Sequence, residues 1–293
     1  MIKNKENKMN INDLKLNEIN DKFIKAMNEA KGRSWLKPFI SNSTGMLPFN
    51  AHAKNTYNGI NIWILNCTQN DKGYQSNEWA TFKQIQKMKG MVNKGEKGTS
   101  IVLYKQINIK DTQTDEIKSI PMMRFFSVFN LDQTTLKRDV IKKPKINKVK
   151  AMKHIDKYVD NLKLDIRHNG NGQCYYKPSE DFINMTAKED FLKVDASTET
   201  ETYYSTLLHE IAHAVCHKDR LDIDMKSYAL EELYAEITSA LQCQIQGIET
   251  VMHQNHATYL NSWIKHIKED KKALLTCCAK AMKSIKWQDE QQQ

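Results

Sequence analysis

The chain has 293 residues, of which 40% are hydrophobic and 27% are charged, and its net charge is +9. This composition excludes a disordered chain, and at roughly 150 residues per domain the length predicts two domains. No apolar run reaches the roughly 20 residues that a transmembrane helix needs. The polar start MIKNKENKMNINDLK lacks a signal-peptide core, and the six cysteines form no CxxC pair. We therefore expect a cytoplasmic protein with reduced thiols and no membrane partner.

The charge is divided unevenly between the halves. Residues 1–150 carry 27 Lys and Arg against 13 Asp and Glu, whereas residues 151–293 carry 17 against 22. An excess of 14 positive charges favours a polyanionic partner for the first half, most often nucleic acid, although a lysine-rich surface can also serve solubility alone. The basic, proline-containing stretch 138–150 predicts a linker. We therefore expect domains at 8–137 and 151–290.

Several elements of the first half follow from periodicity. Residues 13–31 predict an amphipathic helix with Leu16, Ile19, Phe23 and Met27 on its apolar face. Residues 59–66 are apolar but have no clear period. A second helix is predicted from Ser76 or Asn77 to Gly90, with Trp79, Phe82 and Ile85 facing inwards.

Two β-branched and aromatic segments follow this helix. Residues 100–109 and 121–129 predict the strands of an antiparallel hairpin, with the polar residues 111–119 as a long loop. The first domain is therefore expected to be mixed α+β.

The aromatic and basic residues of this half suggest binding of single-stranded nucleic acid. Such binding needs a positive groove and exposed rings on which bases stack. Core packing is the alternative for each ring taken alone, and only the whole collection favours binding. The candidate side chains are Tyr57, Trp79, Lys83, Lys94, Lys97 and Tyr104.

The turn 93–98, NKGEKG, is the most specific piece of this half. Two glycines permit left-handed backbone and a close approach of phosphate, and Lys94 and Lys97 flank them. An ordinary surface loop is the alternative interpretation.

The second half contains the motif HExxH in the run LLHEIAHAV. On a helix, His209 and His213 are one turn apart on one face, so both imidazoles can bind one zinc ion. Glu210 can accept a proton from water bound to that ion. Thr198 and Glu201 have the spacing of a capping box, which places the start of the helix before the motif. A hydrogen-bonded core cluster is the alternative, but burying these polar groups without a metal would be costly.

A third zinc ligand must come from elsewhere in the chain. Residues 227–247 predict a helix ending at Gly247, and Glu232 on it is the favoured ligand. Glu236, one turn further on, is placed to orient a histidine through its free ring nitrogen, unless it is a solvated carboxylate. Competing third ligands are Asp219, His217 and Glu231.

The chemistry expected of such a site is peptide hydrolysis. Zinc lowers the pKa of bound water toward ~7, and Glu210 takes up the proton. His217, His256 and Tyr259 are all candidates to donate a hydrogen bond to the oxyanion.

The chain resembles the ArdC-like antirestriction proteins of plasmids and phages, whose first domain also occurs in some plasmid primases. In the first half the resemblance lies in the segments 35–39 (WLKPF), 48–50 (PFN), 57–61 (YNGIN), 79–84 (WATFKQ) and 92–99 (VNKGEKGT). In the second half it lies in 176–178 (YKP), 209–213 (HEIAH), 231–236 (EELYAE) and 259–264. Three departures are Ala214-Val215-Cys216 after the second histidine, Thr186 at a position where proline is common, and Ala51-His52-Ala53-Lys54 in place of a glycine–arginine loop.

The resemblance implies an α+β protein with an N-terminal domain that binds single-stranded DNA and a C-terminal zincin-like metallopeptidase domain. It adds Asn50 to the candidate DNA-binding residues and implies that residues 176–185 form a strand near the active-site cleft. The implied role is protection of incoming DNA from host restriction. A restriction enzyme or another protein is then a possible partner or substrate.

Two alternative functions share these residues. One is a zinc protease recruited to DNA to cleave proteins bound there. The other is a DNA-binding module whose zinc is structural and catalytically silent. The presence of Glu210 argues mildly against the second, because a structural site needs no general base.

Overall fold

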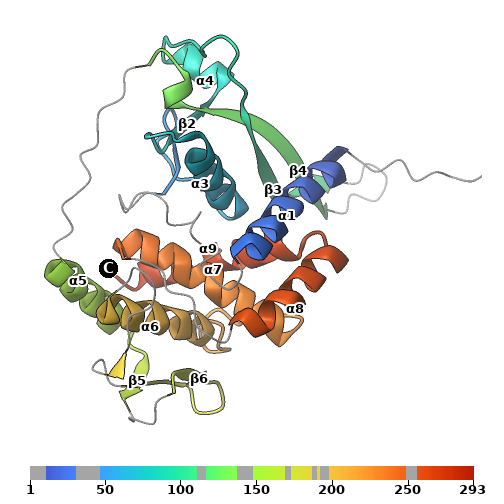
Figure 1. Cartoon of the computed structure of the whole chain (residues 1–293). Helices are drawn as coiled ribbons and strands as arrows, with labels where there is room; N and C mark the ends of the chain where they lie inside the picture. The colour runs from blue at the N-terminus through green and yellow to red at the C-terminus, as the bar shows by residue number, and fades with distance from the viewer. Residues whose placement is uncertain are drawn as a thin grey trace, which may run out of the picture.

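The computed structural model describes residues 11–30, 47–110, 117–136, 148–168, 173–186, 190–191, 198–248 and 256–293. Within these residues no helix is both long and apolar enough to cross a membrane. Figure 1 shows a mixed sheet with helices in the first half and a helical layer with a small sheet in the second.

The first half is the mixed α+β unit that the sequence predicts. The strands of its described residues are ordered β1-β2-β4-β3, with β1 and β2 parallel and the other pairs antiparallel. The elements are α1 (Ile11–Ala30), β1 (Phe49–Asn50), α3 (Ile60–Lys72), β2 (Glu78–Thr81), α4 (Phe82–Lys87), β3 (Thr99–Lys110), β4 (Ile117–Asn130) and the 3-10 turn η1 (Leu131–Gln133).

Helix α1 agrees with the prediction, and the four apolar residues of its predicted face are all buried. The apolar segment 59–66, which has no clear period, lies at the start of α3, and this helix runs on to Lys72. It ends at Gly73, whose φ of 68° is left-handed, the conformation in which glycine terminates helices.

The predicted helix beginning at Ser76 or Asn77 is wrong at its start. Residues 78–81 form β2, and the helix begins only at Phe82, where Thr81 and Gln84 make a reciprocal capping box. Trp79 and Ile85 are buried as expected, but the Phe82 side chain is 50% exposed. The predicted helix start is wrong because the apolar spacing of Trp79, Phe82 and Ile85 crosses the junction between β2 and α4.

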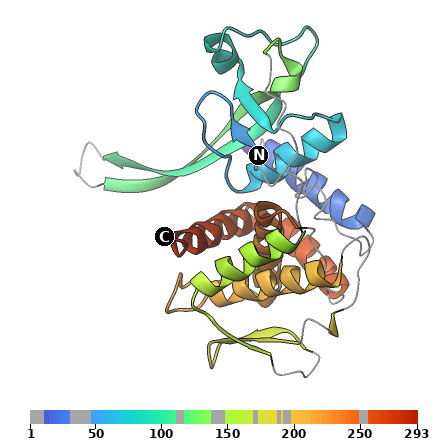
Figure 2. The same ribbon diagram turned by 90° about the vertical axis from the view of Figure 1, so that its left-hand side faces the viewer.

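The antiparallel hairpin is confirmed, and its strands are longer than predicted. Pairing runs from Thr99 opposite Val128 to Lys110 opposite Ile117, so the strands take in part of the expected loop. Figure 2 shows the hairpin as a long two-stranded arm. Its edge strand is held at Val102, whose backbone N–H donates to Asn61 Oδ1 (2.8 Å) and whose carbonyl accepts from Asn61 Nδ2 (2.7 Å).

In the described part of the second half, five helices lie beside a three-stranded sheet of order β5-β7-β6. Of the expected linker 138–150, residues 138–147 lie outside the described part and the last three residues begin α5. The elements are α5 (Lys148–Asn161), β5 (Asp165–His168), β6 (Tyr175–Lys177), β7 (Phe182–Met185), α6 (Glu199–Val215), α7 (Tyr228–Gln246), α8 (His256–Glu269) and α9 (Ala273–Glu290).

Both predicted helices of the metal motif are present. Helix α6 begins with the capping box of Thr198 and Glu201, and α7 begins after Ser227 and ends at Gly247. The two helices pack side by side and are almost wholly buried, which fixes the residues on their facing sides.

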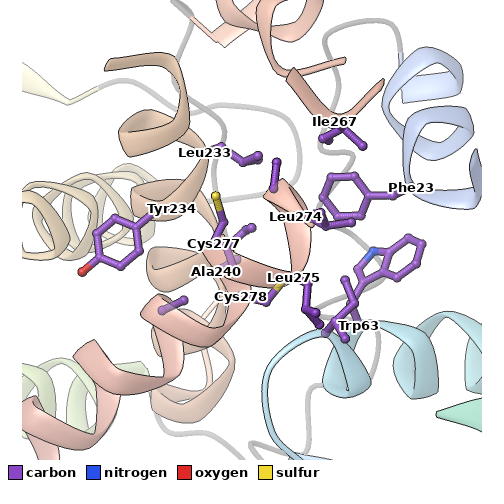
Figure 3. Packing of buried hydrophobic residues seen from close by; sticks show 14 of the residues in the cluster. Phe23, Trp63, Leu233, Tyr234, Ala240, Ile267, Leu274, Leu275, Cys277 and Cys278 are labelled. Atoms are coloured by element: carbon purple, nitrogen blue, oxygen red, sulfur yellow. The ribbon is translucent and has the colours of Figure 1, made fainter. Parts of the chain in front are cut away.

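The two halves share one hydrophobic core. Phe23 of α1 and Trp63 of α3 lie in the same buried cluster as Leu274 of α9 and Leu233 of α7, and Figure 3 shows these side chains together. The Phe23 and Trp63 rings meet edge to face with centroids 5.0 Å apart. The first half therefore packs directly on the helical layer of the second half, with α1 against α8 and α3 against α9.

Candidate functional site

Two histidines and a glutamate converge between α6 and α7. His209 Nε2 and His213 Nε2 are 3.2 Å apart. Glu232 Oε2 lies 3.6 Å from His209 Nε2, and Glu232 Oε1 lies 3.5 Å from His213 Nε2. All three residues are buried. The structure thus brings Glu232, which lies 19 residues after His213 in the sequence, to the two histidines of the motif.

These distances fit a divalent metal ion. Ligand atoms about 2.1 Å from an ion in tetrahedral geometry are roughly 3.4 Å from one another. The three observed separations lie on either side of that value. Two imidazoles and a carboxylate are also ligands that bind zinc in proteins.

Each histidine has a carboxylate partner at its other ring nitrogen. His209 Nδ1 is 2.9 Å from Glu236 Oε1, which is the role that the sequence suggested for Glu236. His213 Nδ1 is 2.9 Å from Glu231 Oε1. Such partners hold the proton at Nδ1 and leave Nε2 free to bind a metal. Glu231, which the sequence offered only as a competing ligand, lies at the orienting position instead.

The carboxylates shift the proton affinities of the site. Burial alone would lower the pKa of His209, but Glu236 and Glu232 raise it well above its usual value. Burial would likewise raise the pKa of Glu232, but the neighbouring imidazoles of His209 and His213 bring it to about 2. The imidazoles and the carboxylates therefore compensate one another strongly.

Glu210 is buried on α6 beside the first histidine. Burial, and to a lesser extent the charge of Glu210, raises the pKa of the Cys174 thiol. Tyr259 is half-buried on α8, whereas the side chain of His256 lies outside the described residues. His217 lies near Asp219, with His217 Nδ1 3.5 Å from Asp219 Oδ2, and the carboxylate of Asp219 is 71% exposed.

A pocket of about 710 Å³ opens beside His213 and Glu231, between the β6–β7 turn and the end of α6. Arg220 fixes one wall of it, because its guanidinium binds Asp181 and its Nε donates to the Ala214 carbonyl at 2.7 Å. The Arg220 hydrogen bond lowers the pKa of the Asp181 carboxyl. The stretch that the resemblance placed near the cleft is thus the pair of strands β6 and β7 rather than one strand.

The lysines proposed to bind DNA are all exposed. Lys83 is on α4, and Lys94 and Lys97 are on the turn between α4 and β3. In this turn only Gly95 has a left-handed backbone, with φ of 90°. Gln133 Nε2 anchors the turn by donating to the Lys97 carbonyl at 3.0 Å. Tyr104 on the hairpin is 41% exposed.

Other candidate DNA-binding residues face inwards. Trp79 is fully buried, so it cannot stack on a base, and the core-packing alternative holds for it. Asn50 is buried, and its Oδ1 accepts from the Ala53 N–H at 2.8 Å while its Nδ2 donates to the Tyr57 hydroxyl at 3.1 Å. Asn50 and Tyr57 thus shape the loop after β1.

Phe82 is the exposed ring that the sequence placed on the wrong face. It begins α4 and is the residue before Lys83. The capping box of Thr81 and Gln84 was the signal that could have placed Phe82 in the exposed first turn of a helix.

Two family models match the chain. Residues 15–129 match the N-terminal domain of anti-restriction factor ArdC, and residues 153–280 match a zincin-like metallopeptidase. A protein of Sinorhizobium fredii, y4eC, is 31% identical over 258 residues, which cover 84% of this chain and 81% of that protein. The metal-free structure of the antirestriction protein ArdC from plasmid R388 has a TM-score of 0.75 at 31% identity and covers 94% of this chain and 97% of its own.

The chain belongs to the ArdC family. The Mn(II)-bound structure of ArdC from R388 is also similar, with a TM-score of 0.71 and 28% identity. DNA primase TraC of Escherichia coli is 31% identical over 275 residues, but the match spans only 24% of that longer protein. The similarity to ArdC thus covers both halves of the chain, and the part that matches the zincin-like metallopeptidase contains α6 and α7.

Proposed function

We propose that this protein is a single-stranded-DNA-binding antirestriction protein of a mobile element whose second half is a zinc metallopeptidase domain. The observation that carries the proposal is the set of separations of 3.2, 3.5 and 3.6 Å among the two imidazole nitrogens and the Glu232 oxygens. The similarity to ArdC of R388 supports the antirestriction role.

Zinc is the ion that this donor set suits best. Two imidazoles and one carboxylate with an open fourth position are the ligands of many catalytic zinc sites. ArdC of R388 is known with Mn(II) bound, so manganese is the competing ion. A competition titration of the full-length protein with both ions tests this assignment, and tighter binding of Mn²⁺ than of Zn²⁺ would contradict it.

The catalytic roles follow from the arrangement on α6 and α7. A bound zinc ion polarises a carbonyl oxygen and lowers the pKa of a water molecule to about 7. Glu210 accepts the proton of the attacking water at its carboxylate and passes it to the leaving amine. Glu236 and Glu231 hold the two imidazoles so that both Nε2 atoms face the shared centre.

The DNA-binding role rests on the first half. Lys83, Lys94 and Lys97 are exposed around α4 and the turn that follows it, and Phe82 offers an exposed ring among them. Lysines that track the phosphates and rings that stack on bases are what single-strand binding requires. A filter-binding titration should show a preference for single strands over duplex and a steep loss of affinity with salt.

A protease recruited to DNA is a second candidate, favoured by the pocket beside His213, which is large enough to hold a peptide side chain. Glu210→Gln separates the candidates. If restriction protection persists while hydrolysis of a DNA-bound protein is lost, antirestriction does not depend on proteolysis. If neither changes, Glu210 is not the general base and the proposed chemistry is wrong.

A further inference from the structure

One face of the hairpin formed by β3 and β4 belongs to the core. Residues directly opposite each other on antiparallel strands share a face, so the register puts Val102, Phe125 and Met123 on the same side. Val102 is 5% exposed there, and Phe125 and Met123 pack against the cluster that α1 and α3 share with the second half. Helix α1 is held on this side, because Asn12 Nδ2 donates to the Met123 carbonyl at 3.1 Å.

The opposite face of the hairpin is apolar but open. Leu103 lies directly opposite Arg124, and Phe126 comes two residues after Arg124 on the same strand, so the three share this face. At the base of the hairpin the face is covered, since Ile101 is buried in one cluster with Trp79. Further out, Leu103 and Phe126 are 40% and 43% exposed. A ring, a leucine and an arginine therefore lie side by side on an uncovered part of the sheet.

The charge of this open face favours a polyanion. Arg124 is exposed, and none of the described carboxylates pairs with it. An arginine guanidinium binds phosphate and stacks on flat rings, and an exposed aromatic ring offers a base a surface for stacking. A protein that covered only the apolar residues here would bury the charge of Arg124 without a counter-charge, which is costly. The combination therefore suits a single strand of nucleic acid better than an apolar protein surface.

The open face leads to the exposed ring of α4. Val128, two residues beyond Phe126 on this face, lies opposite Thr81 of β2, and Phe82 follows Thr81 directly. Standard strand spacings put the Cα atoms of Phe82 and Phe126 at most roughly 16 Å apart. Phe82 is followed by the exposed Lys83. Each of the two rings is thus within two residues of a cationic side chain, and one short single strand can reach both.

We propose that the open face of the hairpin, defined by Leu103, Arg124 and Phe126, is part of the binding surface for single-stranded DNA. The Phe126 ring stacks on a base, and the Arg124 guanidinium binds a phosphate. This inference rests on the DNA-binding role in the proposed function and extends that surface from α4 and its turn onto the hairpin. Tyr104 lies opposite Met123 and so belongs to the other face.

The first test is the affinity of the full-length protein for a labelled oligothymidylate, measured by fluorescence anisotropy. Phe126→Ala should weaken binding about fivefold, because one base loses its stacking partner. Tyr228→Ala, which removes a 61% exposed ring from α7 in the second half, is the matched control and should bind as the wild type does. Wild-type affinity of Phe126→Ala would overturn the stacking role.

The second test uses Arg124→Gln, which changes an exposed side chain and leaves the apolar packing of the hairpin intact. The slope of log affinity against log salt should fall by about 0.7, the value for one phosphate contact with a single strand. Arg167→Gln, at an exposed strand arginine of β5, is the control and should leave the slope unchanged. An unchanged slope for Arg124→Gln would overturn the phosphate contact.

Two further outcomes separate this inference from its alternatives. If Phe126→Ala bound the oligonucleotide normally but weakened self-association in sedimentation equilibrium, the open face would be an interface between copies of the chain and the inference would be wrong. If the wild-type protein bound no single-stranded DNA, the DNA-binding role in the proposed function would itself fail. Wild-type binding that neither Phe126→Ala nor Arg124→Gln weakens would overturn this inference alone.

Discussion

In the second half, the candidate metal ligands point inwards between the packed helices α6 and α7. In the first half, the candidate lysines and the exposed rings of Phe82 and Tyr104 point outwards from α4, the turn that follows it and the hairpin. The inward site is constrained by packing, since His209, His213 and Glu232 are each less than a tenth exposed. The side chains of the outward face are not held by packing, so exposure is the only property that distinguishes the candidate DNA-binding residues there. A buried polar cluster thus specifies its chemistry more sharply than a charged surface does.

The largest expected effect is on the inward site. Glu232→Ala removes one of three ligands, so zinc affinity should fall by more than about 100-fold, at least as much as loss of an orienting partner costs. A chelator competition assay measures this change. Glu199→Gln, an exposed glutamate in the first turn of α6, is the matched control and should leave the affinity unchanged.

Trp79→Ala tests whether this ring belongs to the core of the first half. It should destabilise the protein by about 3–5 kcal/mol, as is usual when a buried tryptophan is truncated. Urea unfolding followed by circular dichroism measures the loss. If Trp79→Ala left the stability unchanged but weakened DNA binding, Trp79 would be a DNA-binding residue and not a core residue.

Glu236→Gln and Glu231→Gln compare the two carboxylates that orient the histidines of the metal centre. The Glu236 carboxylate orients His209, and the amide can still accept a hydrogen bond but carries no charge. Zinc affinity should fall about 10- to 100-fold. Glu231→Gln should cost less, because the Glu231 side chain is 32% exposed and that of Glu236 is 2% exposed. The reverse order would show that burial does not set the importance of these partners.

Phe82→Ala tests the outward face. Base stacking on an aromatic ring contributes about 1–3 kcal/mol, and a half-exposed ring should lie at the lower end, so single-strand affinity should fall about fivefold. Stability should be unchanged, in contrast to Trp79→Ala. Fluorescence anisotropy with a labelled oligonucleotide measures the affinity, and an unchanged value would exclude Phe82 from the site.

The smallest effect is expected for the turn. Lys94→Gln combined with Lys97→Gln should reduce the slope of log affinity against log salt by about 1.4, or about 0.7 for each phosphate contact. The same titration on Lys268→Gln, a lysine at the end of α8, provides the control. Equal slopes for the two variants would place the turn outside the DNA path.

Local patterns predicted much of this structure. The repeat of apolar residues gave α1, the capping box gave the start of α6, and Ser227 and Gly247 gave the bounds of α7. HExxH brought two imidazoles together because one helical turn separates them. These features depend on residues within a few positions of each other, so the sequence records them directly.

Features that depend on distant contacts were harder to predict. Nothing near Trp79 indicates that it lies in a strand between β1 and β4, so helical spacing was counted where a strand begins. The role of Glu231 depends on the rotation of α7 against α6. The shared core of α1, α3, α7 and α9 joins residues more than 200 positions apart, such as Phe23 and Leu274.

The ligands of the metal centre can be tested most directly by X-ray absorption spectroscopy of the zinc-loaded full-length protein. We expect a coordination sphere of nitrogen and oxygen only, near 2.0–2.2 Å, with the scattering pattern of two imidazoles that falls to one in His213→Ala. A sulfur ligand at about 2.3 Å, or a spectrum that His213→Ala leaves unchanged, would contradict it.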